Sequence, residues 1–173
     1  RSSDLKKSNL PKFYLDLNQA HKNSLKKTSP WTPAVTLVIG LNAVLEYFNK
    51  IGLDNLFKRH SILSQATTEG FEAIGLENFA KGCTSTALSV IKAPKDIDAN
   101  LIVKGLKEKY GMIVAGGQDQ AKGKIFRITH MGYVDKGDII AVVAGVEGIL
   151  CELGYNFKSG AGVARTTQIL DKL

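Results

Sequence analysis

One arginine stands in the middle of a segment whose other side chains favour a β-strand. In "KIFRIT", residues 124–129, the β-branched and aromatic side chains predict extended structure. Side chains alternate along a strand, so Phe126 and Ile128 face one side while Arg127 faces the other. A planar guanidinium can bind a carboxylate through two parallel hydrogen bonds. The residues alone leave two interpretations of Arg127, a carboxylate clamp or a solvated surface arginine.

A second candidate site is the segment "SPWTP", residues 29–33, which directly precedes a long apolar segment. A helix that begins there would direct its first backbone N–H groups, together with the Thr32 hydroxyl, toward an anion such as phosphate. The alternative is purely structural, with Thr32 as the N-cap and Pro33 at the first helical position. Both interpretations of Thr32 stay open at this level.

Other residues that could do chemistry carry weaker signals. The pair Gly116-Gly117 would let a ligand approach the backbone, or is an ordinary flexible connection. The segment "GAGVAR", residues 160–165, loosely resembles a dinucleotide fingerprint, but no predicted strand precedes it and we reject that interpretation. The histidines His21, His60 and His130 show no metal-ligand spacing. We expect His60 to pack on the core side of its helix.

Composition excludes several classes of protein. The net charge is +7 and the pI about 9.4, yet the basic residues are scattered, so we expect a solvated surface and no nucleic-acid partner. No apolar run reaches the roughly 20 residues of a membrane span, and the polar N-terminus has no signal-peptide pattern. Cys83 and Cys151 lie far apart, with Cys151 expected to be buried, which predicts a reducing, cytoplasmic location. Because the chain begins with Arg1 inside a charged stretch, we expect it to be part of a longer polypeptide.

The helices that would position these residues follow from periodicity and capping. Residues 34–51 predict a helix that is apolar around much of its circumference, buried against something large and ended by Gly52. A second helix is predicted over residues 53–74, closed by Gly75. Asp98 is placed to cap a helix that ends before Gly111, and Asp135 to cap the final helix.

Strands are predicted at residues 76–79, 86–91, 112–115 and 124–129. From residue 53 the order is therefore α-β-β-α-β-β-α. This order predicts an α/β chain whose C-terminal part is an α+β domain, with a mostly antiparallel sheet covered by helices on one face. If helices cover the side of Phe126 and Ile128, then Arg127 lies on the open face.

Four stretches together resemble one protein family. They are "LPKFYLDL", "SPWTPAVTLVIGLNAVLEYFNKIGLDNLFKRH", "GMIVAGGQDQAKGKIFRITHMGYVD" and "GVEGILCELGY". From about Leu10 to the end, the chain resembles the C-terminal part of class V aminotransferases of the serine/alanine–glyoxylate group. The bacterial subgroup often labelled soluble hydrogenase small subunit is the most similar. Two isolated cysteines cannot supply the metal ligands of a hydrogenase, so we discount that chemistry.

The resemblance implies a homodimeric enzyme of the pyridoxal-phosphate-dependent type I fold, acting on small amino acids and 2-oxo acids. Residues 1–54 would be the tail end of the large cofactor-binding domain, and residues 55–173 a small C-terminal α/β domain. The family's arginine that binds the substrate carboxylate corresponds to Arg127. The threonine that contacts the cofactor phosphate of the neighbouring subunit corresponds to Thr32, with Trp31 as an aromatic candidate beside it.

One departure from the family is an absence. The family's Schiff-base lysine would fall upstream of Arg1, so no catalytic residue is assigned within this chain. We therefore expect a fragment of a transaminase that is inactive alone. The alternative from another functional class is a non-catalytic α+β module that binds an anion or nucleic acid.

Overall fold

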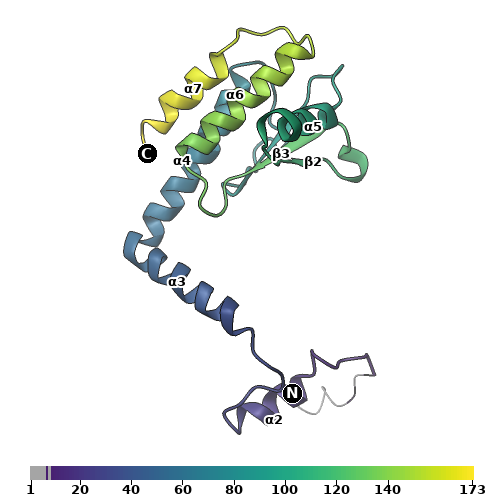
Figure 1. Ribbon diagram of the computed structural model, residues 1–173, viewed down its shortest axis with the longest axis vertical. Coiled ribbons are helices and arrows are strands. Elements are labelled where there is room, and N and C mark those ends of the chain that lie inside the picture. The colour runs from purple at the N-terminus through teal and green to yellow at the C-terminus, as the bar shows by residue number, and fades with distance from the viewer. Residues whose placement is uncertain (1–6, 8) are drawn as a thin grey trace. The chain divides into compact units, whose positions relative to one another are not determined.

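The computed structural model describes residue 7 and residues 9–173, and its contacts group the chain into two compact units. The first unit ends at Lys50 and the second is Ile51–Leu173. The element order is α2, α3, α4, β1, α5, β2, the 3₁₀ helix η1, β3, α6 and α7 (Figure 1). No helix among the described residues is long and apolar enough to cross a membrane.

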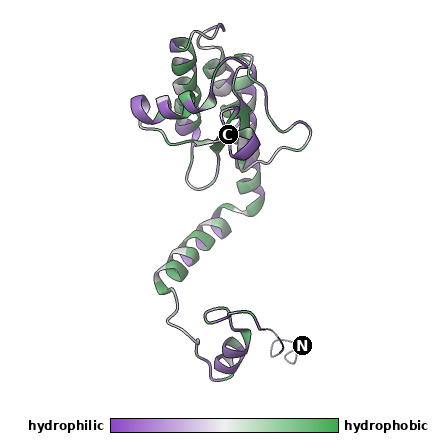
Figure 2. Ribbon diagram, turned by 90° about the vertical axis from the view of Figure 1, so that its right-hand side faces the viewer, coloured by the Kyte–Doolittle hydropathy of each residue, from purple (hydrophilic) through white to green (hydrophobic). Residues whose placement is uncertain are grey.

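The described part of the first unit contains helices α2 and α3 and their connecting segments. Helix α2 (Leu17–Ser24) begins at the N-cap Asp16, whose side chain accepts hydrogen bonds from the N–H groups of Asn18 and Gln19. Helix α3 (Val35–Ile51) confirms the predicted helix of residues 34–51. Figure 2 shows hydrophobic residues along much of α3.

The prediction that this apolar helix is buried is not met by the described residues. No residue of α3 is buried, and Leu37 and Ile39 are 74% and 64% exposed. The other described residues of the unit form helix α2, which has no buried residue, and loops. The apolar face of α3 is therefore exposed, with no cover from the described residues of its own unit.

In the second unit, four helices pack with a three-stranded sheet. The helices are α4 (Leu53–Glu72), α5 (Ala99–Tyr110), α6 (Lys136–Glu152) and α7 (Ala161–Leu170). The strands β1 (Leu88–Lys92), β2 (Ala115–Gly116) and β3 (Ile125–Thr129) lie in the order β1-β3-β2, and both pairs are antiparallel. The predicted antiparallel sheet covered by helices on one face is confirmed (Figure 1).

One apolar core joins the sheet to three of these helices. It contains Phe71 of α4, Leu106 of α5, Val146 of α6, and Ile91 and Phe126 of the sheet, all fully buried. The rings of Phe71 and Phe126 meet edge to face at 5.6 Å between centroids. This core lies on the Phe126 and Ile128 side of β3, as the alternation predicts, and leaves the Arg127 side uncovered by helices.

Helix capping follows the sequence closely. The Asp98 carboxylate accepts the N–H of Asn100 at 2.8 Å, and Gly111 ends α5 with φ of 67°. Asp135 and Asp138 form a capping box at the start of α6. Both predicted caps are confirmed.

Several strand predictions need correction. Residues 76–79 contribute only an isolated bridge between Asn78 and Ile91, because the Leu76 N–H bonds back to Phe71 at the end of α4. Residues 112–115 are mostly not strand, because the Met112 N–H bonds to Leu106 and prolongs the C-terminal hydrogen bonding of α5.

Two predictions near the C-terminus are wrong. Helix α6 is not the final helix, because α7 follows it and packs against α4 and α6. Cys151 is exposed, since it directly follows the buried Leu150 and points out of the buried stripe of α6. The "GAGVAR" segment starts α7 after a preceding helix, so the rejection of a strand-based dinucleotide site agrees with the structure.

Candidate functional site

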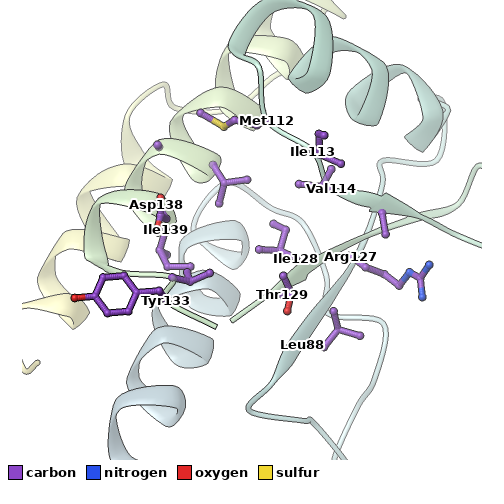
Figure 3. A pocket seen from close by; sticks show the side chains of 14 residues that line it. Leu88, Met112, Ile113, Val114, Arg127, Ile128, Thr129, Tyr133, Asp138 and Ile139 are labelled. Atoms are coloured by element: carbon purple, nitrogen blue, oxygen red, sulfur yellow. The ribbon is translucent and has the colours of Figure 1, made fainter. Parts of the chain in front are cut away.

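Arg127 lies in the central strand of the sheet, with neighbours on both sides. It is paired with Val90 of β1 and Ala115 of β2. The Arg127 side chain is half-buried, and its Nε donates a hydrogen bond to the carbonyl of Gly116 at 3.0 Å. Figure 3 shows Arg127 and Ile128 leaving the strand in opposite directions. A charged side chain thus stands on the open face, held by a backbone carbonyl.

The Gly116 contact leaves the outer edge of the guanidinium available. No carboxylate among the described residues forms an ion pair with Arg127, although other basic side chains of this unit do form such pairs, among them Lys92 and Lys109. The two Nη groups of Arg127 have no hydrogen-bond partner in the described part of the chain. Their two parallel N–H donors match the two oxygens of a carboxylate.

Arg127 also lines a cavity of about 650 Å³ between the sheet and the start of α6 (Figure 3). Most of the lining is apolar, with Leu88, Ile113 and Val142 among its members. Asp138 is the acidic lining residue, but its carboxylate already accepts the N–H of Asp135 in the capping box. Arg127 is the cationic lining residue, and its guanidinium points away from the other lining side chains, toward the open face of the sheet (Figure 3).

The candidate phosphate residues lie in the first unit. Thr32 is exposed, and its hydroxyl has no partner in the described part of the chain. The structural alternative for Thr32 is wrong, because α3 begins at Val35 and its first backbone bond runs from Val38 to Ala34. Thr32 therefore precedes the helix without capping it.

Trp31 belongs to an aromatic cluster with Phe13 and Tyr14. Its ring centroid lies 4.4 Å from that of Phe13 and 5.0 Å from that of Tyr14. The Trp31 Nε1 is buried and has no acceptor in the described part of the chain. A buried N–H without a partner is costly, so an acceptor brought by a ligand would stabilise it.

The histidines occupy three different environments. His21 is exposed, and His60 is half-buried with its Nδ1 2.9 Å from the Leu56 carbonyl. His130 is fully buried beside β3, with its Nε2 2.8 Å from the Ser89 hydroxyl. Burial, together with the nearby His60, lowers the pKa of His130 from 6.5 to about 4. His130 is therefore neutral near pH 7.

Two parts of this site escaped sequence reasoning. The Gly116 carbonyl that holds Arg127 is a backbone group, and no pattern in side-chain types marks it. The bond between Ser89 and His130 joins residues 41 positions apart, so only the pairing of β1 with β3 reveals it. Among the described residues, no group of three or more His, Cys, Asp or Glu is placed to hold a metal ion.

Comparison with known proteins decides the family. The class-V aminotransferase family profile matches residues 14–140, which include Trp31, Thr32 and Arg127. The chain belongs to the class V aminotransferase family. The resemblance drawn from the four quoted stretches is confirmed.

The relatives in this family carry two kinds of name. A "soluble hydrogenase, small subunit" of Synechococcus sp. is 43% identical over 167 residues, covering 95% of this chain and 43% of the relative. A serine–glyoxylate aminotransferase of Methylorubrum extorquens is 32% identical over 163 residues, covering 93% of this chain and 40% of the relative. This class V chain thus spans less than half the length of the curated relatives it matches.

Solved structures show the same fold. The ureidoglycine–glyoxylate aminotransferase of Bacillus subtilis superposes with a TM-score of 0.88 at 24% identity, covering 97% of this chain and 44% of that one. The aspartate aminotransferase of Thermus thermophilus superposes with a TM-score of 0.71 at 28% identity, covering 86% of this chain and 42% of that one. The chain therefore has the fold of the part of these enzymes that it covers.

Proposed function

We propose that this chain is the C-terminal part of a pyridoxal-phosphate-dependent aminotransferase that moves an amino group between a small amino acid and a 2-oxo acid such as glyoxylate. Arg127 carries the proposal. Its guanidinium is fixed by the Gly116 carbonyl, keeps two N–H donors available, and has no carboxylate partner within the described residues. Both reactants of a transamination carry the carboxylate that such a fork binds. The names of several relatives support the choice of glyoxylate as acceptor.

The residues of the first unit fit a cofactor phosphate. The exposed Thr32 hydroxyl and the unsatisfied Trp31 Nε1 are donors one residue apart, and both lack an acceptor in the described part of the chain. Thr32 would donate to a phosphate oxygen of the neighbouring subunit's cofactor, and Trp31 would support that contact. Pyridoxal phosphate, when bound, supplies the electron sink for breaking bonds at the amino-bearing carbon.

Within this arrangement, the chain's own residues bind and orient. Arg127 fixes the substrate carboxylate, so the amino or oxo group at the adjacent carbon is held in one orientation. The lysine that binds the cofactor covalently would come from the part of the polypeptide outside residues 1–173. The fragment alone is then inactive, and the complete protein carries the activity.

The proposal also assigns the residues of this chain to two domains of the complete protein. Residues 1–54 would complete the large cofactor-binding domain, and residues 55–173 would form the small domain. The apolar face of α3 would be covered in the complete homodimer, because more than half of the Leu37, Val38 and Ile39 side-chain surface is exposed in the unit itself. The cytoplasm is the proposed compartment.

The proposal is tested in the complete protein by Arg127→Ala, with Lys124→Ala as the matched control. Lys124 is an exposed cation on the same segment. Losing two charge-assisted hydrogen bonds of about 1.5 kcal/mol or more each predicts a KM for the amino acid raised by about a hundredfold or more. Lys124→Ala should leave KM within about twofold of wild type. An unchanged KM in Arg127→Ala would remove Arg127 from the site.

A spectrum tests the cofactor. The complete protein should show a visible absorption band from pyridoxal phosphate that shifts when serine or alanine is added. A colourless protein that takes up no added pyridoxal phosphate would overturn the proposed function. Binding of an anion without transamination would then be the remaining role.

A further inference from the structure

Three polar side chains lie next to one another on the core side of the sheet, opposite to the face that carries Arg127. The Ser89 hydroxyl lies 2.8 Å from His130 Nε2 and 3.4 Å from the Thr68 hydroxyl of α4. Ser89 and His130 are 1% and 0% exposed. On the core side of β1 the next residue after Ser89 is Ile91, and on the core side of β3 the residues before His130 are Phe126 and Ile128. These polar groups occupy a place where apolar residues would be expected.

The unpartnered nitrogen of the His130 ring decides which of its two nitrogens carries the hydrogen. His130 Nδ1 is buried and has no partner in the described part of the chain. A neutral imidazole has one N–H and one bare nitrogen, and a buried bare acceptor costs less than a buried N–H without an acceptor. His130 Nε2–H therefore donates to the Ser89 hydroxyl, and either hydroxyl can be the donor in the longer and weaker contact between Ser89 and Thr68.

The hydrogen bonds among Thr68, Ser89 and His130 connect three elements of the second unit. His130 follows β3, Ser89 lies in β1 and Thr68 lies in α4. The backbone N–H of His130 also bonds to the Ala87 carbonyl at 2.9 Å, so the β1–β3 pairing continues past the end of β3. Apolar contacts between a helix and a sheet are non-directional, whereas a hydrogen bond between fixed groups holds only one relative position.

Arg127 lies on the same two paired strands as this hydrogen bond, with its side chain on the opposite face. It is three residues before His130, and its partner in β1 is Val90, the neighbour of Ser89. A shift of β1 along β3, or of both strands along α4, would move the Arg127 side chain with its strand. A displacement of about 1 Å at a binding group can cost up to about a hundredfold in turnover efficiency.

We propose that Ser89 and His130 are positioning residues for the carboxylate clamp: their buried hydrogen bond holds β1 in place against β3 and so sets where the Arg127 guanidinium stands. Thr68 extends the bond to the helix. Neither Ser89 nor His130 reaches the open face, so they act through Arg127 and not on the substrate. The kinetic part of this inference rests on the proposed aminotransferase function.

The test compares Ser89→Ala with Thr166→Val in the complete protein. Thr166 is a matched control because it is fully buried on the other side of α4, where its hydroxyl donates to the Ala66 carbonyl at 3.2 Å. Ser89→Ala should raise the KM for amino acid and for oxo acid about five- to thirtyfold, with kcat within about threefold of wild type. Thr166→Val should leave KM within about twofold even if both variants lose similar stability.

Two further variants keep the test decisive if Ser89→Ala folds poorly. His130→Gln retains a side-chain N–H that can reach Ser89 and should keep KM within about threefold of wild type, whereas His130→Leu should show the Ser89→Ala defect. Thr68→Val changes the shape little and should raise KM by a smaller factor, about two- to threefold.

A second measurement needs no activity. Hydrogen exchange of the amides in residues 125–130 should accelerate at least about tenfold in Ser89→Ala and stay within about twofold of wild type in Thr166→Val. If the wild-type protein does not transaminate, the proposed function falls, and the exchange data alone decide the positioning role. Equal exchange and equal KM in Ser89→Ala and Thr166→Val would overturn the inference.

Discussion

Acid should destabilise the second unit through the buried His130. Burial is the larger cause of the lowered pKa, and the nearby His60 adds to it, so the pKa of His130 falls from 6.5 to about 4. Protonation would add a charge and a second N–H to a ring whose Nδ1 already lacks a partner among the described residues. The folded state therefore resists a proton that the unfolded chain accepts readily.

The size and sign of this effect follow from the two pKa values. Because the folded pKa lies below the unfolded one, the stability is fully present above pH 6.5 and is lost as pH falls toward 4. The total loss is about 3 kcal/mol, taking about 1.4 kcal/mol per pKa unit. Between pH 7 and pH 5 the free energy of unfolding should drop by about 2 kcal/mol from this group alone.

The assay is urea unfolding followed by far-UV circular dichroism at pH 7, 6 and 5, on wild type and His130→Gln. The single tryptophan, Trp31, lies in the first unit, so its fluorescence does not report on the second. Glutamine does not titrate, so the difference between the two proteins isolates the contribution of His130, which includes its repulsion with the nearby His60. A difference in pH dependence below about 0.5 kcal/mol between the two proteins would refute the reasoning.

Two further predictions concern helix packing in the same unit. Gly70→Ala would place a Cβ 2.1 Å from the Thr166 hydroxyl, so it should lower the free energy of unfolding by about 1–3 kcal/mol, although alanine favours helix. In a double-mutant cycle, adding Thr166→Ala should recover much of that loss. If nothing is recovered, the strain lies elsewhere. Glu147→Gln should lower the free energy of unfolding by about 1–3 kcal/mol and accelerate amide exchange at Gly160 and Val163. The buried Glu147 carboxylate accepts both of these N–H groups at the start of α7, whereas an amide offers one oxygen only. Unchanged exchange at these two amides would contradict that capping role.

Much of the local structure could be predicted because its causes lie within a few residues. Asp98 and Asp135 mark the starts of α5 and α6, since an N-cap acts on the next two or three N–H groups. The alternation in "KIFRIT" correctly puts Phe126 in the core and Arg127 on the opposite face. The nomination of Arg127 as a binding residue therefore needs only the period of a strand and the chemistry of a guanidinium.

The failures arose where a distant contact overrides a local preference. Residues 112–115 have strand-forming side chains, yet the end of α5 takes the Met112 N–H and leaves a two-residue β2. Helix α7 packs against α4 and α6, and the Glu147 carboxylate accepts the Gly160 N–H at its start. Propensity could not reveal these partners, because they are brought together only by folding.

The sequence alone determined helices α3 to α6, the N-caps of α5 and α6, the side of the strand on which Arg127 lies and, through the quoted stretches, the family. Only the tertiary structure decided that the Gly116 carbonyl holds the guanidinium and that Ser89 and His130 meet beneath it. The physical reason is range. Periodicity and capping are short-range properties written in neighbouring residues, whereas hydrogen bonds across the sheet depend on which segments pair and in which register.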